Sequence, residues 1–322
     1  TVQVFSGSQT SGTCTVSNGV TQDCGVGPGV VGVSARVLVT GGPDIIAERP
    51  MYVNGADFGS GPVRDGHDAF GAGGPNASWS FAEGTTLNGF IEFLTLQNPG
   101  DTTSNVTIRY FTDSGQTVTR TLALPATSRT TLDVTQGSTA AGPLACTISG
   151  GVAQSCGVGR GVVGVSTSVT VTSGPAIVAE RPMYLSVDFG SGVVAGATVV
   201  VGANSLGRLF GFAGSDTSAG HDDFLTIQNA NAQAATVTIS YYDAAAAFPR
   251  TATLVVPPAT RRTVLIFAAP GAGSGGVGPG FSQLGIVVSS DLPLLVERPT
   301  YSSVDSRYGA TDTMGLPPSP AF

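Results

Sequence analysis

The sequence contains no lysine, and charge of either sign is scarce. All 14 basic residues are arginines, set against 21 acidic residues, so the formal net charge is -7 and charged residues make up 11% of the chain. Apart from the adjacent Arg261 and Arg262, the arginines are scattered singly, whereas binding to nucleic acid through counterion release needs clustered cations. An acidic surface without lysine likewise has little attraction for anionic lipid. We therefore expect neither a nucleic-acid partner nor a membrane-surface function.

Long apolar runs and amphipathic helices are also missing. The longest apolar run, 193–203, is too short to cross a bilayer and is soon followed by Asn204 and Arg208. The chain starts without a basic segment or an apolar signal core, so we expect that any export signal has been removed or lies outside this sequence. The alanine run in 243–249 ends at a proline and fits a hairpin connection. Apolar residues recur with a period of two, which predicts strands and no membrane insertion.

The four cysteines form two local pairs. Nine residues separate Cys14 from Cys24, and nine separate Cys146 from Cys156. Each intervening segment has a turn dipeptide near its middle, as a hairpin closed by a cross-strand disulfide requires. We predict two such disulfides, each worth about 3 kcal/mol in the chain-entropy model. Persistent disulfides indicate an oxidising, extracellular or cell-surface location. Zinc needs more closely spaced ligands, so we expect no metal and no cofactor.

The sequence repeats itself, and the segment "AERPMY" marks the repeat. It occurs at 47–52 and again at 179–184, and a divergent copy, "VERPTY", occupies 296–301. Longer matching blocks extend around and beyond these motifs: 24–52 with 156–184, and 93–134 with 224–267. A fixed order of blocks along the chain indicates a tandem array of one structural unit.

Each copy of the second block reads as four short strands. The alternation that supports this is clearest in Val106, Ile108 and Tyr110 against Thr107, Arg109 and Phe111. With the neighbouring strands, one unit has about seven strands, and units of this size are typical of an immunoglobulin-like sandwich. We predict an all-β chain of tandem immunoglobulin-like antiparallel β-sandwich domains with disulfide-pinned hairpins.

The phase of the repeat predicts an incomplete unit at each end. Residues 1–4 align with 131–134, so about 49 residues, the counterpart of 82–130, are absent from the first unit. We expect an incomplete sandwich with a linker in 1–75 and two complete sandwiches in 76–195 and 196–308. The remaining residues, 309–322, form a tail that could act as a donor strand. A half sandwich leaves an edge and an apolar face uncovered. We expect either another part of a longer polypeptide or a neighbouring copy in trans to complete it.

The recurring Glu-Arg pair is interpreted as structural and not catalytic. Adjacent residues of a strand point to opposite faces, and the following proline indicates a strand end or a sheet edge. We expect the arginines to bind turn carbonyls or carboxylates at domain junctions, with the glutamates pairing nearby and the tyrosines packing beside them. These residues are Glu48, Arg49 and Tyr52; Glu180, Arg181 and Tyr184; and Glu297, Arg298 and Tyr301.

The histidines and a group of aspartates are weaker candidates. His67 and His221 fall at different points of the repeat, so we interpret them as surface or turn residues, not as one duplicated site. A structural calcium ion bound by Asp216, Asp222 and Asp223 is the alternative to a metal-free chain.

The sequence has no recognisable signature of an enzyme. Motifs for a serine or cysteine nucleophile and for a metalloprotease are absent, so we predict no enzymatic activity. Trp79, the single tryptophan, is assigned to the core, with sugar stacking as the alternative. Asn76 and Asn105 lie in sequons that permit glycosylation, which makes glycans a candidate partner.

Four motifs in a fixed order, "AERPMY", "GHDAFGA", "WSFAEG" and "FIEFLTLQNPG", resemble a class of bacterial secreted or cell-surface proteins. The resemblance covers nearly the whole chain and implies an array of sandwich repeats, with no particular activity. The chain departs from the pattern where 196–202 and 309–315 replace the His-Asp motif. We expect a structural subunit of an extracellular filament or surface layer that assembles head to tail with copies of itself. The alternative is a cell-surface adhesion or carbohydrate-binding stalk.

Overall fold

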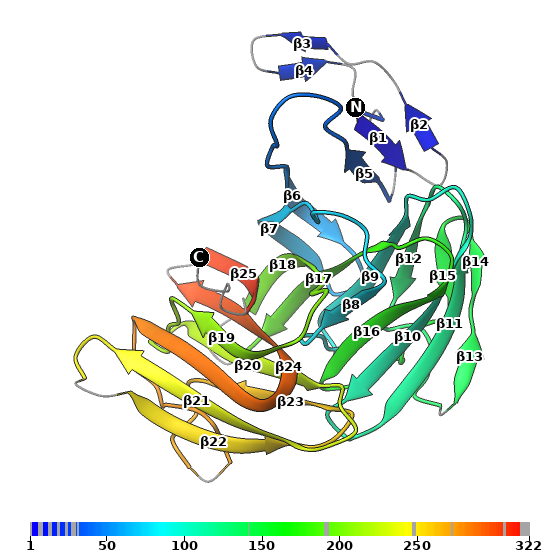
Figure 1. The fold of residues 1–322 in the computed structure, drawn as a ribbon. Coiled ribbons are helices and arrows are strands. Elements are labelled where there is room, and N and C mark those ends of the chain that lie inside the picture. Colours follow the sequence, from blue (N-terminus) through cyan, green and yellow to red (C-terminus); the bar gives the residue numbers. More distant parts are fainter. Residues whose placement is uncertain are drawn as a thin grey trace.

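Strands make up the regular structure of this protein (Figure 1). The computed structural model describes residues 2–5, 9–11, 15–17, 20–22, 25–26, 30, 32–140, 142–189, 193–246, 249–271, 273–304 and 307–315. Its elements run from β1 to β25, without a helix in these ranges. Accordingly, the described residues include no helix with the length and apolarity needed to span a membrane. The all-β class predicted from the sequence is confirmed.

Unit 2, residues 76–201, is built from two sheets with a shared apolar core. One sheet has the strand order β13-β11-β10-β16-β8 and the other β14-β15-β12-β9-β17-β18. The bounds are β8 Ser78–Phe81, β9 Phe90–Asn98, β10 Ser104–Thr112, β11 Thr117–Leu124, β12 Ser128–Asp133, β13 Pro143–Ala145, β14 Thr147–Ser149, β15 Val152–Gln154, β16 Val165–Ser173, β17 Val178–Asp188 and β18 Val193–Val201. Phe81, Leu96, Ile108 and Leu132 belong to the core that both sheets supply.

Strand β10 shows why the period of two appears in the sequence. Val106, Ile108 and Tyr110 are buried in the core of unit 2, and Arg109 between them is exposed. Phe111, which alternates with the core residues, is nevertheless fully buried. It lies outside the core cluster, in the strand that approaches β23 of the next unit. Burial there comes from a neighbouring unit, which a single-strand pattern does not reveal.

Unit 3, residues 203–315, repeats this arrangement around one long strand. Its sheet order is β22-β21-β24-β20-β23, and β19 and β25 also pair with β24. The bounds are β19 Gly207–Phe212, β20 His221–Asn229, β21 Ala235–Asp243, β22 Arg250–Val256, β23 Thr260–Leu265, β24 Leu284–Val304 and β25 Arg307–Met314. In unit 2 a turn with Gly174 at φ 89 separates β16 from β17. At the equivalent position unit 3 has Asp291 instead of glycine, and β24 continues through it without a turn.

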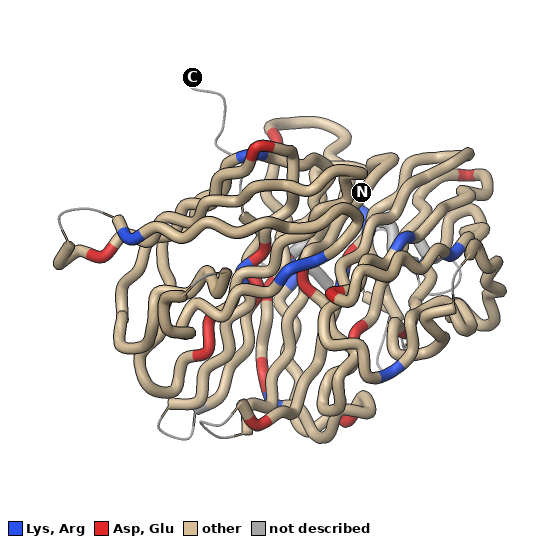
Figure 2. The backbone as a smooth tube through the Cα atoms, turned by 90° about the horizontal axis from the view of Figure 1, so that it is seen from below, with Lys and Arg blue, Asp and Glu red and all other residues tan. Residues whose placement is uncertain are grey.

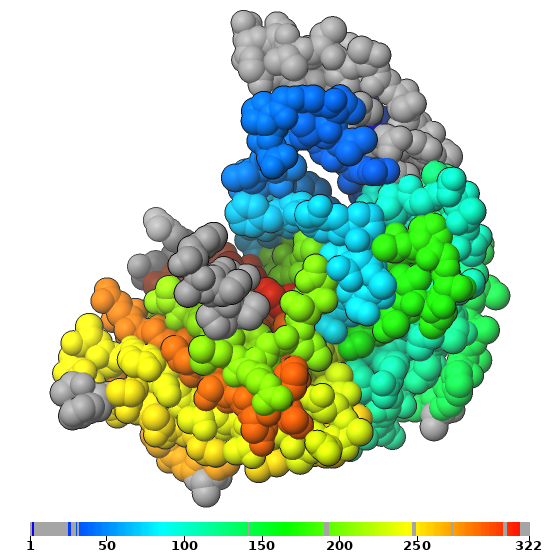
Figure 3. Space-filling view, in the orientation of Figure 1, coloured from blue at the N-terminus to red at the C-terminus, as the bar shows by residue number. Residues whose placement is uncertain are grey.

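Unit 1, within residues 2–70, does not reproduce the sheets of unit 2. Its strands are β1 Val2–Phe5, β2 Gln9–Ser11, β3 Thr15–Ser17, β4 Val20–Gln22, β5 Ser34–Val37, β6 Glu48–Asp57 and β7 Pro62–Phe70. Strand β1 pairs with β2 and β5, whereas the equivalents of β1 and β5 in unit 2, β12 and β16, lie in different sheets. Unit 1 has no equivalents of β9, β10 and β11 to separate them. In the space-filling view it forms a lobe beside the two larger units (Figure 3).

The cysteine hairpin of unit 2 is closed by a disulfide. Cys146 and Cys156 are bonded, with their Cα atoms 5.6 Å apart, and they flank the antiparallel pair β14–β15. Strands β3 and β4 of unit 1 pair in the equivalent register. The predicted partners there, Cys14 and Cys24, lie outside the described residues.

Each unit ends in a long hairpin, and the three hairpins meet at the centre of the molecule (Figure 1). They are β6–β7, β17–β18 and β24–β25. The expected boundaries at 195/196 and 308/309 fall inside β18 and β25. Residues 309–314, expected as part of a donor strand, pair with β24 of their own hairpin. Residues 316–322 lie outside the described part of the chain.

Candidate functional site: the junctions between units

The Glu-Arg pair links each unit to the following one. Arg49 Nη1 of unit 1 lies 2.9 Å from Glu180 Oε2 of unit 2. Arg181 Nη1 of unit 2 lies 2.9 Å from Glu297 Oε2 of unit 3. The arginine of one motif therefore binds the glutamate of the next motif, in the same direction at both junctions. Figure 2 shows how few charged residues the chain has and that acidic and basic segments adjoin near its centre.

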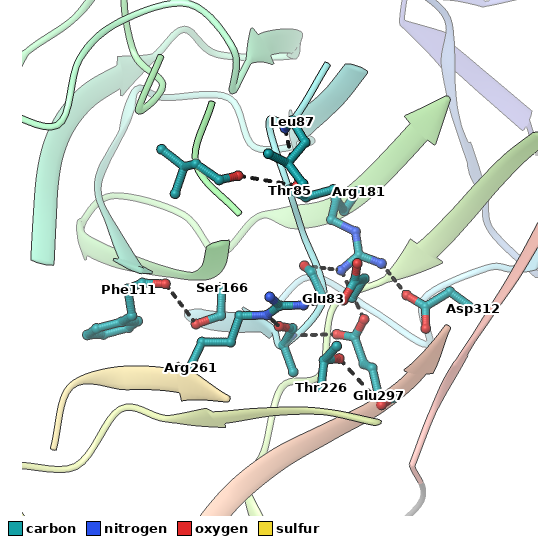
Figure 4. A network of polar contacts seen from close by, with 12 residues as sticks. Glu83, Thr85, Leu87, Phe111, Ser166, Arg181, Thr226, Arg261, Glu297 and Asp312 are labelled. Atoms are coloured by element: carbon teal, nitrogen blue, oxygen red, sulfur yellow. Dashed lines mark hydrogen bonds and ion pairs between the residues drawn. The ribbon is translucent and has the colours of Figure 1, made fainter. Parts of the chain in front are cut away.

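The junction between units 2 and 3 is buried. The side chains of Arg181 and Glu297 are 1% and 0% exposed. Arg181 also forms an ion pair with Asp312 and donates to the Glu83 carbonyl (Figure 4). Burial by itself would lower the pKa of Arg181, but the charges of Glu297 and Asp312 outweigh it and raise that pKa. Removing one partner of such a buried pair leaves an uncompensated charge and typically costs about 3–5 kcal/mol.

A second arginine holds the backbone of unit 2 at the same junction. Arg261 of β23 donates from Nε to the Ala82 carbonyl at 2.9 Å and forms an ion pair with Glu83. Glu297 Oε1 accepts from the Ala82 amide at 2.7 Å. Unit 3 thus satisfies both backbone polar groups of Ala82, which would otherwise be buried without partners.

The carboxylates of this junction outnumber its arginines. Four acidic side chains, Glu83, Glu92, Glu297 and Asp312, face Arg181 and Arg261. Burial raises the pKa of Glu92 to about 8 despite the opposing charge of Arg181. Burial and the neighbouring Glu297 raise the pKa of Asp312 in the same direction. The raised pKa of Glu92 lies above neutral pH, so this buried carboxyl favours its protonated, uncharged form there.

Aromatic stacking accompanies the ion pairs in the same direction. Phe58, after β6, stacks on Tyr184 of unit 2 with ring centroids 3.9 Å apart and 21° between the planes. Phe189, after β17, stacks on Tyr301 of unit 3 at 4.7 Å and 24°. Units 1 and 2 therefore each extend an aromatic ring, placed directly after the first strand of the hairpin, onto the motif tyrosine of the following unit.

One aspartate connects all three hairpins. Asp65 Oδ2 in β7 accepts from the Ala197 amide of β18 at 2.9 Å and from the Ala310 amide of β25 at 3.2 Å. The backbones of β18 and β25 approach closely here. A Cβ on Gly196 would lie 2.7 Å from Ala310 Cβ. Unit 1 therefore contacts unit 3 as well as unit 2, so the three units do not form a straight row.

In the described part of the chain, Arg298 in the last unit and Glu48 in the first unit do not pair with a motif residue of another unit. Arg298 of unit 3 binds within its own unit, to Asp223 at 3.4 Å and to the Gly214 carbonyl. Glu48 of unit 1 is exposed beside Asp68, whose charge raises the pKa of Glu48. Of the motif residues, Arg49, Glu180, Arg181 and Glu297 form ion pairs between units.

The histidine and aspartate candidates make local contacts. His67 lies in β7, where burial and the charge of Arg49 lower its pKa. His221 Nε2 is 3.9 Å from Asp216 Oδ2. Asp216 Oδ1 accepts from the Ser218 amide, and Asp223 Oδ2 accepts from Ser215 Oγ. Within the described ranges, Asp216, Asp222 and Asp223 are not part of any His, Cys, Asp or Glu group of three or more arranged to hold a metal.

Trp79 and the sequon asparagines occupy different environments. Trp79 is 3% exposed in β8 and donates from Nε1 to the Ile177 carbonyl, so its ring belongs to the core. Asn76 is half-buried and accepts from the Ser78 amide. Asn105 is exposed and donates to Ser173 Oγ. No indole face is therefore available at Trp79 for stacking on a sugar.

Sequence reasoning missed several residues of the junctions. Asp312, Glu83 and Arg261 contact partners more than a hundred residues away, and no local pattern signals such pairs. Phe58 and Phe189 had a usable signal. Both stand in the repeated segment "DFGSG", directly after the hairpin strand of their unit.

Comparison with known proteins assigns no family to this chain. No protein-family model matches it, and no curated protein matches it. Among solved structures, the crystal structure of Thermotoga maritima 1070 is similar at 15% identity, over 36% of this chain and 97% of that chain, with a TM-score of 0.31. Similarity at this level supports no conclusion about fold or function.

Proposed function

We propose that this chain is a non-enzymatic structural subunit of an extracellular filament or surface layer, of the kind found in bacteria, built from tandem immunoglobulin-like sandwiches. The observation that carries the proposal is the recurrence of one junction. Arg49 to Glu180 and Arg181 to Glu297 are the same contact made twice. A contact that repeats in one direction is the element from which open polymers are built.

The exposed surface of unit 1 supports assembly with a neighbour. Ile45 is 59% exposed, whereas its equivalent in unit 2, Ile177, is 0% exposed. Val37 is 47% exposed and its equivalent Val169 is 1% exposed. In unit 2 the strands that unit 1 lacks help to cover these positions. Exposed apolar positions of this kind favour completion of unit 1 in trans.

The polar residues of the junctions support a structural role. Arg181, Glu297 and Arg261 are buried and bind groups of the neighbouring unit, as expected for residues that hold two units together. The disulfide between Cys146 and Cys156 fits an oxidising, extracellular compartment.

Electron microscopy of the purified chain over a range of concentrations tests this proposal. We expect uniform polymers whose axial repeat corresponds to one chain. Isolated particles at every concentration would contradict the filament. Particles that bind glycans instead would favour the adhesion or carbohydrate-binding stalk.

A further inference from the structure

Two acidic side chains on the outer face of unit 1 reproduce a site that is filled elsewhere in the molecule. Glu48 lies in β6 and Asp68 in β7, and Asp68 is paired with Pro50 of the Glu-Arg-Pro motif. In unit 3, Glu297 lies in β24 and Asp312 is paired with Pro299 in the same register. The two hairpins therefore offer the same pair of carboxylates at the same positions of their strands.

The site in unit 3 shows what this pair binds. Glu297 and Asp312 both hold the guanidinium of Arg181, which comes from the preceding unit. A planar guanidinium with several N–H donors suits two carboxylates placed side by side. Glu48 and Asp68 are exposed, and the charge of Asp68 raises the pKa of Glu48, as expected for two carboxylates without a cation between them.

The tyrosine beside the acidic pair is uncovered in the same way. Tyr52 is 86% exposed. Its equivalents, Tyr184 and Tyr301, are 7% and 3% exposed because Phe58 and Phe189 of the preceding units stack on them. Unit 1 thus presents both elements of the accepting side of a junction, the carboxylate pair and the aromatic ring.

Unit 3, the last unit of this chain, carries the arginine of the donating side. Arg298 lies over the ring of Phe212 at 5.8 Å and donates to the Gly214 carbonyl. Arg181 lies over Phe81 at the same distance and donates to the equivalent carbonyl, that of Glu83. The side chain of Arg298 is 16% exposed, whereas that of Arg181 is 1% exposed. Arg298 is therefore held like Arg181 but is less covered.

We propose that a second copy of this chain places Arg298 between Glu48 and Asp68, so that the junction found twice within the chain continues between chains. The inference rests on the proposed head-to-tail assembly and names its contact. The occupant is a second copy because the first and last units of this chain carry groups of complementary charge, the accepting carboxylates in unit 1 and the donating arginine in unit 3.

The absence of lysine gives a specific test. In an Arg298→Lys variant with an acetylated N-terminus, position 298 carries the single primary amine, and a carbodiimide joins amines to carboxylates in direct contact. We expect covalent oligomers in which peptide mapping finds the introduced lysine joined to Glu48 or Asp68. Arg49→Lys is the positive control and should link to Glu180 within one chain, since these side chains are 2.9 Å apart. Arg109→Lys, at an exposed position of β10, should give no specific link.

Glu48→Gln with Asp68→Asn provides an independent measurement on wild-type Arg298. Both positions are exposed, so this variant should keep its melting temperature while its self-association weakens at least about tenfold. If the wild type associates and the double variant associates equally well, the contact is wrong and the assembly proposal survives. If the wild type does not associate at any concentration, both proposals fail. In the Arg298→Lys variant, links from the introduced lysine only to Asp223 of the same chain would also overturn the contact.

Discussion

The junction between units 1 and 2 and the junction between units 2 and 3 use the same motif but differ in burial. Arg49 and Glu180 are 39% and 22% exposed, whereas Arg181 and Glu297 are 1% and 0% exposed. The partly exposed pair Arg49–Glu180 is screened by water and contributes little to the free energy of unfolding, about 0.2–1 kcal/mol. The buried pair fixes how two units meet, because neither charge can lose its partner without a large penalty. One motif thus gives a partly exposed contact between units 1 and 2 and a fully buried contact between units 2 and 3.

Replacing the motif arginine at each junction should give the largest difference in stability between the two junctions. We expect Arg181→Ala to lower the free energy of unfolding by about 3–5 kcal/mol, because Glu297 and Asp312 would be buried without a cation. Arg49→Ala should lower it by less than about 1 kcal/mol. Denaturant unfolding of the two variants measures the difference. Equal losses would show that burial does not distinguish the junctions.

Replacing the motif tyrosines should give the second largest difference in stability. Tyr301 is buried against Phe189, Phe90 and Phe224, so Tyr301→Ala should cost about 3 kcal/mol. Tyr52→Ala, at an exposed position, should change the stability of the isolated chain by less than about 0.5 kcal/mol. Thermal unfolding at low protein concentration measures both. A large loss for Tyr52→Ala would contradict its exposure in the single chain.

Exchanging one residue should make the two junctions more alike. Val199 in unit 2 occupies the position that Asp312 occupies in unit 3. We expect Asp312→Val to cost about 1–2 kcal/mol, less than the loss of Arg181, because Glu297 still pairs with Arg181. Chemical denaturation of the variant measures the cost. A loss as large as that of Arg181→Ala would assign the pairing energy mainly to Asp312.

The buried carboxyl of Glu92 predicts a pH dependence at the junction between units 2 and 3. The folded pKa is about 8 and the ordinary value is 4.5, so between these values the folded state keeps a proton that the unfolded state loses. Stability should therefore fall as pH rises through this window. Relative to Glu92→Gln, the wild type should lose up to about 1.4 kcal/mol for each pH unit between 5 and 8. Parallel stability curves for the two proteins would contradict the raised pKa.

The sequence was sufficient for the features that depend on neighbouring residues. The period of two predicted strands in 93–134, which form β9 to β12. The alanine run after Asp243 has high helix propensity but joins β21 to β22, as its proline and its position between strands indicated. The spacing of Cys146 and Cys156 likewise predicted the disulfide that closes β14 and β15.

The remaining features depend on how whole units pack. Phe111 alternates with core residues yet is buried, because the next unit lies against that end of β10. Asp312 was read as part of a tail and instead completes the site for Arg181. Strand β1 pairs with β5 because the strands that separate their equivalents in unit 2 are absent from unit 1. Contacts of this kind follow from three-dimensional proximity, which no short segment encodes.

Sedimentation velocity of the wild-type chain and of Glu48→Gln with Asp68→Asn, over a wide range of concentrations, tests the central claim most directly. If the junction continues between chains, the wild type should give sedimentation coefficients that keep rising with concentration beyond those of a dimer, while the double variant stays near the monomer. A wild type that sediments as a folded monomer throughout would contradict the account.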